Sequence, residues 1–357
     1  MLTSTPPDAV ARAVAATRRR RRAGLALALV ALLVAAVVSV GVGPVAVHPW
    51  TSARIVAAHL LPGEHVATWT AAQDQIVWGL RLPRVLLAAL VGAALAVVGA
   101  VLQAVVRNPL ADPYVLGSSS GAALGAVVAL SAGAAVPGLL VTGSAFAGAT
   151  VAGAVVYLLA ARGGRLEPLR LVLAGVALSY LFSAVTGWIT ATAEHGTLPG
   201  LLFFLLGSIS SATWASLALP ALALVVGVAF VVARAGHLDA AATGDETATS
   251  LGVDMDRLRV EALVVTSLLT GAVVAVAGGI GFVGMVVPHL CRLVVGGSHR
   301  VLLPLVVPAG ALLVVVVDTV ARTAAAPREI PLGVVTALVG APFFLWLLRT
   351  RPVGSER

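Results

Sequence analysis

Apolar stretches long enough to cross a lipid bilayer recur along almost the whole chain, and they restrict its fold more than any other feature. A transmembrane helix needs about 20 mostly apolar residues to cross a hydrocarbon core of about 30 Å. Strands of membrane barrels instead alternate apolar and polar residues, and these stretches do not. We therefore predict an all-α polytopic membrane protein with about ten transmembrane helices, at roughly 24–47, 83–105, 114–136, 138–161, 170–192, 213–233, 258–277, 280–296, 301–322 and 331–348.

The distribution of arginine predicts how these spans are oriented. All 23 basic residues are arginine, and all but five lie near segments that are cytoplasmic when the N-terminus is placed in the cytoplasm. Cytoplasmic loops carry such an excess. We therefore divide the chain into a cytoplasmic basic segment (1–23), a single transmembrane domain (24–348) and a cytoplasmic tail (349–357). The first apolar stretch is too long for a signal peptide, so it is predicted to remain as a helix.

Composition excludes several classes of function. The net charge of +8 does not indicate nucleic-acid binding, because the arginines lie at the ends of spans rather than on one polar surface. The chain contains no lysine, so it cannot supply a nucleotide-binding P-loop, and any ATP that drives it is hydrolysed by another subunit. The single cysteine, Cys291, allows no internal disulfide. Because the sequence has no HExxH, no CxxC and no clustered histidines, we predict no metal site. Because it has no P-loop, we predict that the chain itself is not an enzyme.

The five exceptional arginines are predicted on the outer side, where arginine is disfavoured. We interpret Arg54 and Arg328 as interfacial anchors. Arg81 and Arg84 flank Pro83, so both are expected at the start of one helix. The fifth exceptional arginine, Arg322, follows Asp318 by four residues. The two side chains should therefore share a helix face, as an ion pair or a common site. A lone carboxylate in an apolar span is costly and normally has a partner.

Two further patterns concern packing and a cytoplasmic loop. Gly92, Ala96 and Gly99 line one face of the second span, a spacing that lets helices approach closely in lipid. The longest cytoplasmic loop, 237–256, is polar and is expected to hold a short helix from Asp245 to Leu251 that ends at Gly252. That loop is either a solvated connector or an element that transmits force from a cytoplasmic ATPase.

Many ordered motifs of the chain are similar to those of the FecCD-type ABC transporter family, the permeases of iron-chelate, haem and vitamin B12 importers. The resemblance runs from about residue 75 to 350. The chain departs from the family at Gly279, where relatives often have proline. It departs again at Leu169, near the cytoplasmic gate, where some relatives have small hydroxyl residues, so no gate residue is predicted. The motifs that carry it are RLPR (81–84), LVGAALAVVGAVLQ (90–103), RNPLADP (107–113), LGSSSGA (116–122), LVLAGVALS (171–179), LLGSISSATW (205–214), GDETATSLGV (244–253), GGIGFVGMVVPHLCRLVVG (278–296), HRVLLP (299–304), DTVAR (318–322) and EIPLGVVTALVGAPFFLWLL (329–348).

The resemblance implies a type II ABC importer permease fold in a bacterial cytoplasmic membrane, with both termini cytoplasmic. It implies a second permease subunit, two cytoplasmic ATPase subunits that hold ATP and Mg²⁺, and an extracytoplasmic substrate-binding protein. This chain itself would bind no cofactor. The family positions that receive the binding protein fall on Arg81, Arg84 and Arg322. Those of the ATPase-coupling segment are Gly244, Asp245, Glu246, Ser250, Leu251, Gly252 and Val253, and Arg107, Asn108, Pro109 and Leu110 form a structural turn.

The function expected from these observations is import of a ferric siderophore by alternating access. Vitamin B12 and haem stay open as cargo, because small apolar and hydroxyl residues such as Ser179, Ser183 and Thr186 say little about specificity. Two rival classes are a secondary transporter or channel and an intramembrane enzyme. The first would need ionisable residues in mid-membrane, where only Asp318 comes close. The second would need a nucleophile with a base, or a metal set, inside the bilayer, and the sequence shows no such cluster. The sequence does not reveal whether the second permease is a copy of this chain.

Overall fold

The structure of the chain is a computed structural model that describes residues 7–43, 45–61, 67–113, 117–134, 138–162, 165–193, 196 and 198–350. It is helical apart from two two-residue antiparallel strands, which confirms the predicted fold class. The elements are α1 (Pro7–Gly41), α2 (Pro49–Leu60), α3 (Ala71–Asp74), η1 (Gln75–Arg81), α4 (Leu82–Val106), α5 (Ser118–Ser131), α6 (Leu139–Ala160), β1 (Ala161–Arg162), β2 (Arg165–Leu166), α7 (Pro168–Ala191), α8 (Leu198–Leu206), η2 (Ala215–Leu217), α9 (Ala218–Thr243), α10 (Asp245–Ser250), α11 (Met255–Ala277), α12 (Val283–Val295), α13 (His299–Thr323) and α14 (Leu332–Thr350).

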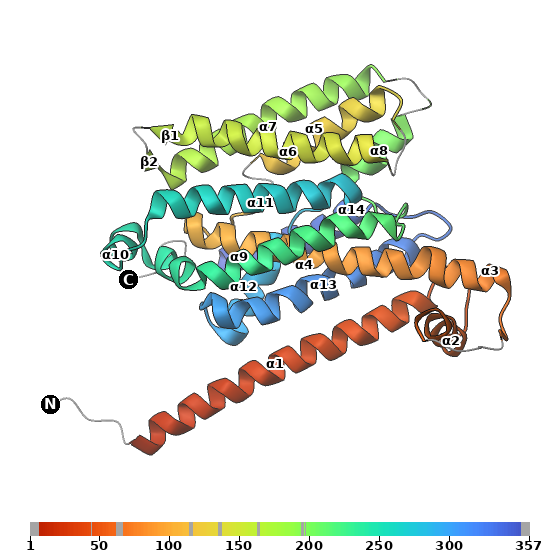
Figure 1. Cartoon of the computed structure of the whole chain (residues 1–357), viewed down its shortest axis with the longest axis horizontal. Coiled ribbons are helices and arrows are strands. Elements are labelled where there is room, and N and C mark those ends of the chain that lie inside the picture. The colour runs from red at the N-terminus through yellow and green to blue at the C-terminus, as the bar shows by residue number, and fades with distance from the viewer. Residues whose placement is uncertain are drawn as a thin grey trace.

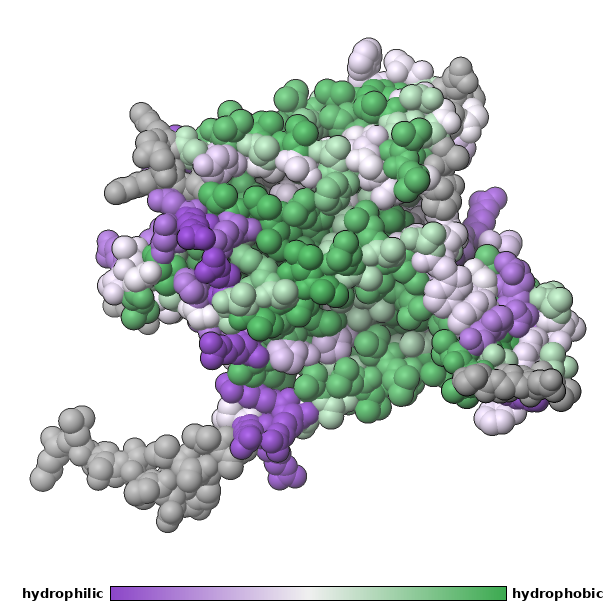
Figure 2. Space-filling view, viewed as in Figure 1, coloured by the Kyte–Doolittle hydropathy of each residue, from purple (hydrophilic) through white to green (hydrophobic). Residues whose placement is uncertain are grey.

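Within the described residues, 7 helices are long and apolar enough to span a membrane. The shorter apolar helices Ser118–Ser131, Val283–Val295 and Leu332–Trp346 fall in the other three predicted spans. Most of the long helices run side by side along one direction (Figure 1). Apolar side chains cover the middle of the visible face, and polar side chains gather at its two ends, near α10 and near α2 and α3 (Figure 2). That distribution is the one a bilayer requires.

Helix α4 forms the centre of the bundle, packed against α9, α11, α12 and α13. Its most apolar window is 83% buried, whereas the corresponding windows of α1 and α7 are 17% buried. A second apolar cluster joins α5 and α6 to α8 and to the end of α11. Helices α1 and α7 thus lie at the edge of the single chain, with most of their side chains free to face lipid or another subunit.

The small residues of α4 explain why this helix is at the centre. A Cβ on Gly92 would overlap the backbone carbonyl of Gly310 in α13, and a Cβ on Gly99 would overlap the carbonyl of Gly284 in α12. The predicted small-residue face is therefore confirmed as the surface on which two neighbouring helices approach most closely.

Several predicted boundaries were wrong. The second span does not begin at Pro83, because a capping box between Thr70 and Gln73 starts a continuous helix at Ala71. The π-helical turn of Gln75–Arg81 widens this helix just before the proline, which relieves the clash that proline causes in a regular α-helix. Helix α1 ends at Gly41 rather than at residue 47.

Two helices, α2 and α8, were not predicted at all. Helix α2 begins at Pro49, where the ring of His48 accepts a hydrogen bond of 3.2 Å from the backbone N–H of Trp50. Helix α8 is only nine residues long. Both are too short to give a transmembrane signal in the sequence.

Candidate functional site

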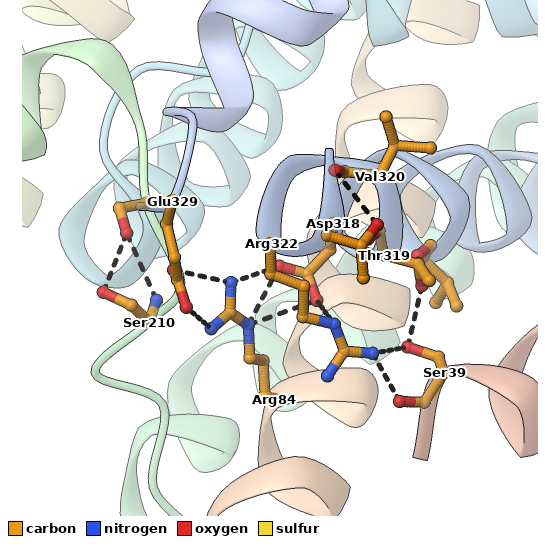
Figure 3. Close-up of polar contacts among 11 residues, drawn as sticks. Ser39, Arg84, Ser210, Asp318, Thr319, Val320, Arg322 and Glu329 are labelled. Atoms are coloured by element: carbon orange, nitrogen blue, oxygen red, sulfur yellow. Dashed lines mark hydrogen bonds and ion pairs between the residues drawn. The ribbon is translucent and has the colours of Figure 1, made fainter. Parts of the chain in front are cut away.

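A cluster of charged side chains joins α4, α13 and the 324–331 loop at the α2 and α3 end of the bundle (Figure 3). The Arg84 guanidinium donates to Asp318 through Nε at 2.9 Å and Nη2 at 2.8 Å. It also donates to Glu329 through Nη1 at 2.8 Å and Nη2 at 3.0 Å. The Arg84 side chain is 12% exposed, the Asp318 side chain 0% and the Glu329 side chain 31%. Arg84 is thus clamped between one buried carboxylate and one that solvent reaches.

The second guanidinium beside Asp318 belongs to Arg322, one turn along α13. Its Nε lies 3.8 Å from Oδ2 of Asp318, so the predicted pair is present, and the predicted need of Asp318 for a partner is met twice. Arg322 also donates to the backbone carbonyl and the hydroxyl of Ser39 in α1, and the Thr319 hydroxyl donates to Ser39 Oγ at 2.9 Å (Figure 3). The cluster therefore ties α1 to α13 as well as α13 to α4.

Arg81 does not belong to this cluster of charges. Its guanidinium donates to the carbonyls of Val40 at 3.0 Å, Gly41 at 2.9 Å and Val45. The last carbonyls of a helix have no partner within the helix. A cation there is also stabilised by the negative end of the helix dipole. Arg81 and Arg322 together cap the final turn of α1, through the carbonyls of Ser39, Val40 and Gly41.

The three predicted docking arginines are therefore all engaged within the chain. Arg81 is 6% exposed and Arg322 is 4% exposed. Their backbone partners in α1 were not predicted, because bonds to carbonyls of a distant helix leave no sequence pattern. Docking of a binding protein at these positions stays a prediction, and Arg84 is the one whose clamp includes a carboxylate that solvent reaches.

At the opposite end of the bundle, the predicted coupling segment and the predicted structural turn meet (Figure 1). Asp245, the first residue of α10, pairs with Arg259 of α11 at 2.6 Å and with Arg107 at 3.7 Å. Arg107 ends α4 with a positive φ of 53°, and the Asn108 side chain then accepts from the N–H of Leu110 at 2.9 Å. One carboxylate thus links α10 to both α4 and α11.

Helix α10 has an anchored side and an exposed side. It runs from Asp245 to Ser250, close to the predicted bounds, and Gly252 follows with a φ of 81°. The N–H of Val253 returns to the carbonyl of Ala248 at 3.0 Å, the closure of a Schellman motif. Ala248 and Val253 are buried, whereas Leu251 is 68% exposed. Leu251, which follows the last residue of α10, is therefore an exposed apolar side chain beside an anchored backbone.

A second polar cluster at this end was missed by sequence reasoning. Asp239 of α9 accepts from the backbone N–H of His299 at 2.7 Å and lies 2.6 Å from its ring Nδ1. Its other oxygen accepts from Ser298 Oγ at 2.9 Å. The start of α13 is thus capped by a carboxylate from another helix. Ser298 just before an apolar span was the available signal for a helix start, but the partner in α9 had none.

A cavity of about 660 Å³ is lined by α5, the C-terminal part of α7, α8 and Gly279, which lies between α11 and α12. Ser183 and Thr186, two of the hydroxyl residues singled out in the sequence, line it, and Ser179 accepts a hydrogen bond of 3.2 Å from Ser120 on the opposite wall. The described residues that line this cavity carry no charge: Ser119, Ser120, Ala123, Ser183, Thr186, Gly187, Thr190, Ala191, Ala193, Leu198, Leu205 and Gly279.

In the part of the chain that the structure describes, no three His, Cys, Asp or Glu residues lie close enough together to hold a metal ion. The cavity can therefore offer hydroxyl groups and apolar surface to a bound molecule. Its walls are suited to a large neutral or charge-masked ligand rather than to a bare cation, which prefers carboxylate or imidazole ligands.

Comparison with known proteins gives the same family as the motifs. The sequence profile of the FecCD transport family matches residues 29–350. The chain is 44% identical over 308 residues to the cobalamin import system permease protein BtuC of Halobacterium salinarum, covering 85% of this chain and 80% of that protein. It is 40% identical over 287 residues to the Fe(3+)-citrate import system permease protein YfmD of Bacillus subtilis, covering 80% and 85%.

A solved structure extends the likeness to the fold. It shows a protein assigned to the metal-chelate type of ABC transporter in an inward-facing conformation. That chain shares 31% identity with this one at a TM-score of 0.79, covering 92% of this chain and 99% of its own. The chain therefore belongs to the FecCD transport family and is a permease subunit of an ABC importer.

Proposed function

We propose that the chain imports a ferric siderophore across the cytoplasmic membrane by alternating access. In this proposal a second permease subunit, either a copy of this chain or a close homologue, completes the pathway. Two ATPase subunits supply the energy, and an extracytoplasmic protein delivers the cargo. The observation that carries it is the cavity of a FecCD-family permease whose described lining residues carry no charge. ATP and Mg²⁺ belong to the ATPase subunits, and this chain binds neither.

The cavity supports a chelate as cargo. A volume of about 660 Å³ is in the range that accommodates small organic ligands, and its hydroxyl groups can bond to the outer atoms of a chelate whose metal charge is already masked. A neighbouring cavity of about 740 Å³ shares Leu205 and Gly279 with it. Helix α7, exposed along much of its length, lines the first cavity, so a second permease placed against α7 would close it.

Cobalamin is the second candidate cargo, since the permease that is 44% identical to this chain is named for cobalamin import. Haem is the third. The three are separated by measuring uptake of labelled ferric siderophore, cobalamin and haem in a strain that lacks this chain. Loss of siderophore uptake alone, restored by the wild-type chain, supports the first cargo. Loss of cobalamin or haem uptake alone replaces it, and no loss of any of the three contradicts the proposal.

Helix α10 is proposed as the contact that receives the ATPase. Its buried face is braced by Asp245 against α4 and α11, so a displacement of α10 would be passed to both helices. The exposed Leu251 supplies apolar contact area. Leu251→Asp should abolish co-purification of a P-loop ATPase with the tagged chain. Leu60→Asp, the same change at a side chain 65% exposed on α2, should leave it intact. Equal yields of ATPase with both variants would refute this contact.

The binding protein is proposed to dock over the arginine cluster at the other end. Arg81 and Arg322 hold the end of α1 in place beneath the surface, and an incoming carboxylate would reach Arg84 by displacing Glu329. Exposed charge pairs contribute about 0–1 kcal/mol each, so they would mainly orient the partner.

If an incoming carboxylate replaces Glu329 at Arg84, two variants should change the affinity for the delivery protein in opposite directions. Arg84→Glu should weaken binding of the delivery protein, whereas Glu329→Gln should strengthen it by freeing one side of the guanidinium. The affinities are measured by surface binding to the chain in nanodiscs. An unchanged affinity in both variants would remove Arg84 from the docking surface.

A further inference from the structure

Five consecutive arginines, Arg18–Arg22, lie on α1 at the α10 end of the bundle, and the structure divides them into two groups. Arg20 donates to the carbonyl of Leu293 at 3.1 Å, and Arg21 donates to the carbonyl of Val295 at 3.2 Å. These carbonyls belong to the last turn of α12, where cations are favoured. Two of the five arginines therefore fasten α1 to the bundle.

The other three arginines turn away from the bundle. Arg18, Arg19 and Arg22 are exposed and have no ion-pair partner among the described residues. With Ala23 and Ala26 they line an open hollow of about 460 Å³ on the outer side of α1. The small alanine side chains leave the guanidinium groups standing above a shallow apolar floor, and polar side chains gather at this end of α1 in Figure 2.

An apolar stripe continues from this hollow along the same side of α1. Leu27, Val30, Leu33, Val34, Val37 and Val38 recur at helical spacing and are 48% to 71% exposed. From Arg22 to Val38 a helix rises about 24 Å, close to the thickness of the hydrocarbon core. When the stripe lies in the apolar layer, the three guanidinium groups lie at one edge of it, at the depth of lipid phosphates.

We propose that this hollow binds the phosphodiester headgroup of an anionic phospholipid, with its acyl chains along the α1 stripe. Three guanidinium groups without an ion-pair partner among the described residues complement the charge of a phosphate. A guanidinium can donate two parallel hydrogen bonds to two oxygens of one phosphate. The adjoining exposed leucine and valine side chains can be covered by the acyl chains of a lipid. A soluble anion has no acyl chain and would leave them uncovered. An acidic segment of a partner protein would satisfy the charges but leave the stripe uncovered.

The test measures the lipid preference of the full chain by native mass spectrometry, using phosphatidylglycerol and phosphatidylcholine with identical acyl chains. The wild-type chain should bind phosphatidylglycerol at least about tenfold more tightly, and the preference should shrink at high salt. R18Q/R19Q/R22Q should lose the preference. The control R257Q/R300Q/R349Q removes three exposed arginines at the same end and should keep it.

Three results would overturn the proposal. If the wild-type chain shows no preference for phosphatidylglycerol over phosphatidylcholine, the proposal is overturned whether or not any variant folds. An equal loss in the control variant would show a general effect of charge rather than a site. If R18Q/R19Q/R22Q keeps the lipid preference but loses a co-purifying partner, the three arginines bind protein instead.

Discussion

Replacing Asp318 by asparagine tests how the arginine cluster holds three helices together. The Asp318 side chain is 0% exposed and accepts from Arg84 at 2.8 Å and 2.9 Å, while Arg322 lies 3.8 Å away. Removing one charge of a buried pair costs about 3–5 kcal/mol, because the other charge is left without compensation. Here Arg84 keeps Glu329 and Arg322 keeps Ser39, so we expect Asp318→Asn to cost about 3 kcal/mol, at the lower end of that range.

A neighbouring carboxylate provides the matched control. Glu329 bonds the same guanidinium at 2.8 Å, but its side chain is 31% exposed. Glu329→Gln should therefore cost about 1 kcal/mol or less, as for an exposed pair. The double variant removes both carboxylates from Arg84, so its cost should exceed the sum of the two single costs.

The assay is unfolding of the purified chain by SDS in mixed micelles, followed by circular dichroism. The free energy of unfolding is compared among the wild-type chain, the two single variants and the double variant. Equal costs for the two single variants would refute the role of burial. A double variant that is merely additive would refute the view that both carboxylates compensate one shared guanidinium.

Three further predictions concern other parts of the molecule. Gly99→Val should prevent close packing of α4 on α12 and sharply lower the yield of folded chain in a detergent extraction, whereas Gly143→Val, which meets no atom within 4 Å, should not. Asp245→Asn should weaken the brace of α10 and so reduce transport while membrane insertion stays normal, as measured by uptake and by the amount of chain in the membrane fraction. Ser183→Trp should fill the cavity and abolish uptake without loss of the co-purifying ATPase; normal uptake would remove that cavity from the pathway.

Much of the fold could be predicted from local patterns. Hydropathy located the 7 long apolar helices of the described residues and the three shorter ones, since each span is a property of a single stretch of sequence. The Gly92 and Gly99 spacing predicted the close-packed face of α4, and the glycine at 252 predicted where α10 ends. The start of the second span was misplaced because Pro83 reads as a helix start, whereas the capping box at Thr70 and the π-helical turn carry the helix past it.

The candidate sites depended more on contacts between distant segments. Asp318 and Arg322 are four residues apart, so their pairing could be predicted, but Arg84 and Glu329 are joined to them only by the fold. The caps that Arg81 and Arg322 place on α1, and the cap that Asp239 places on α13, join residues far apart in the sequence. Such bonds carry no local pattern, and they account for most of what sequence reasoning missed at both ends of the bundle.

The central claim is that transport through this permease is driven through α10 by an ATPase. The most direct measurement compares uptake of labelled ferric siderophore by cells that produce the wild-type chain or the Leu251→Asp variant, at equal amounts of chain in the membrane. We predict that the variant loses uptake together with its ATPase, while Leu60→Asp retains both. Full uptake by a Leu251→Asp chain from which the ATPase has been lost would contradict the account and indicate a transporter that needs no ATPase.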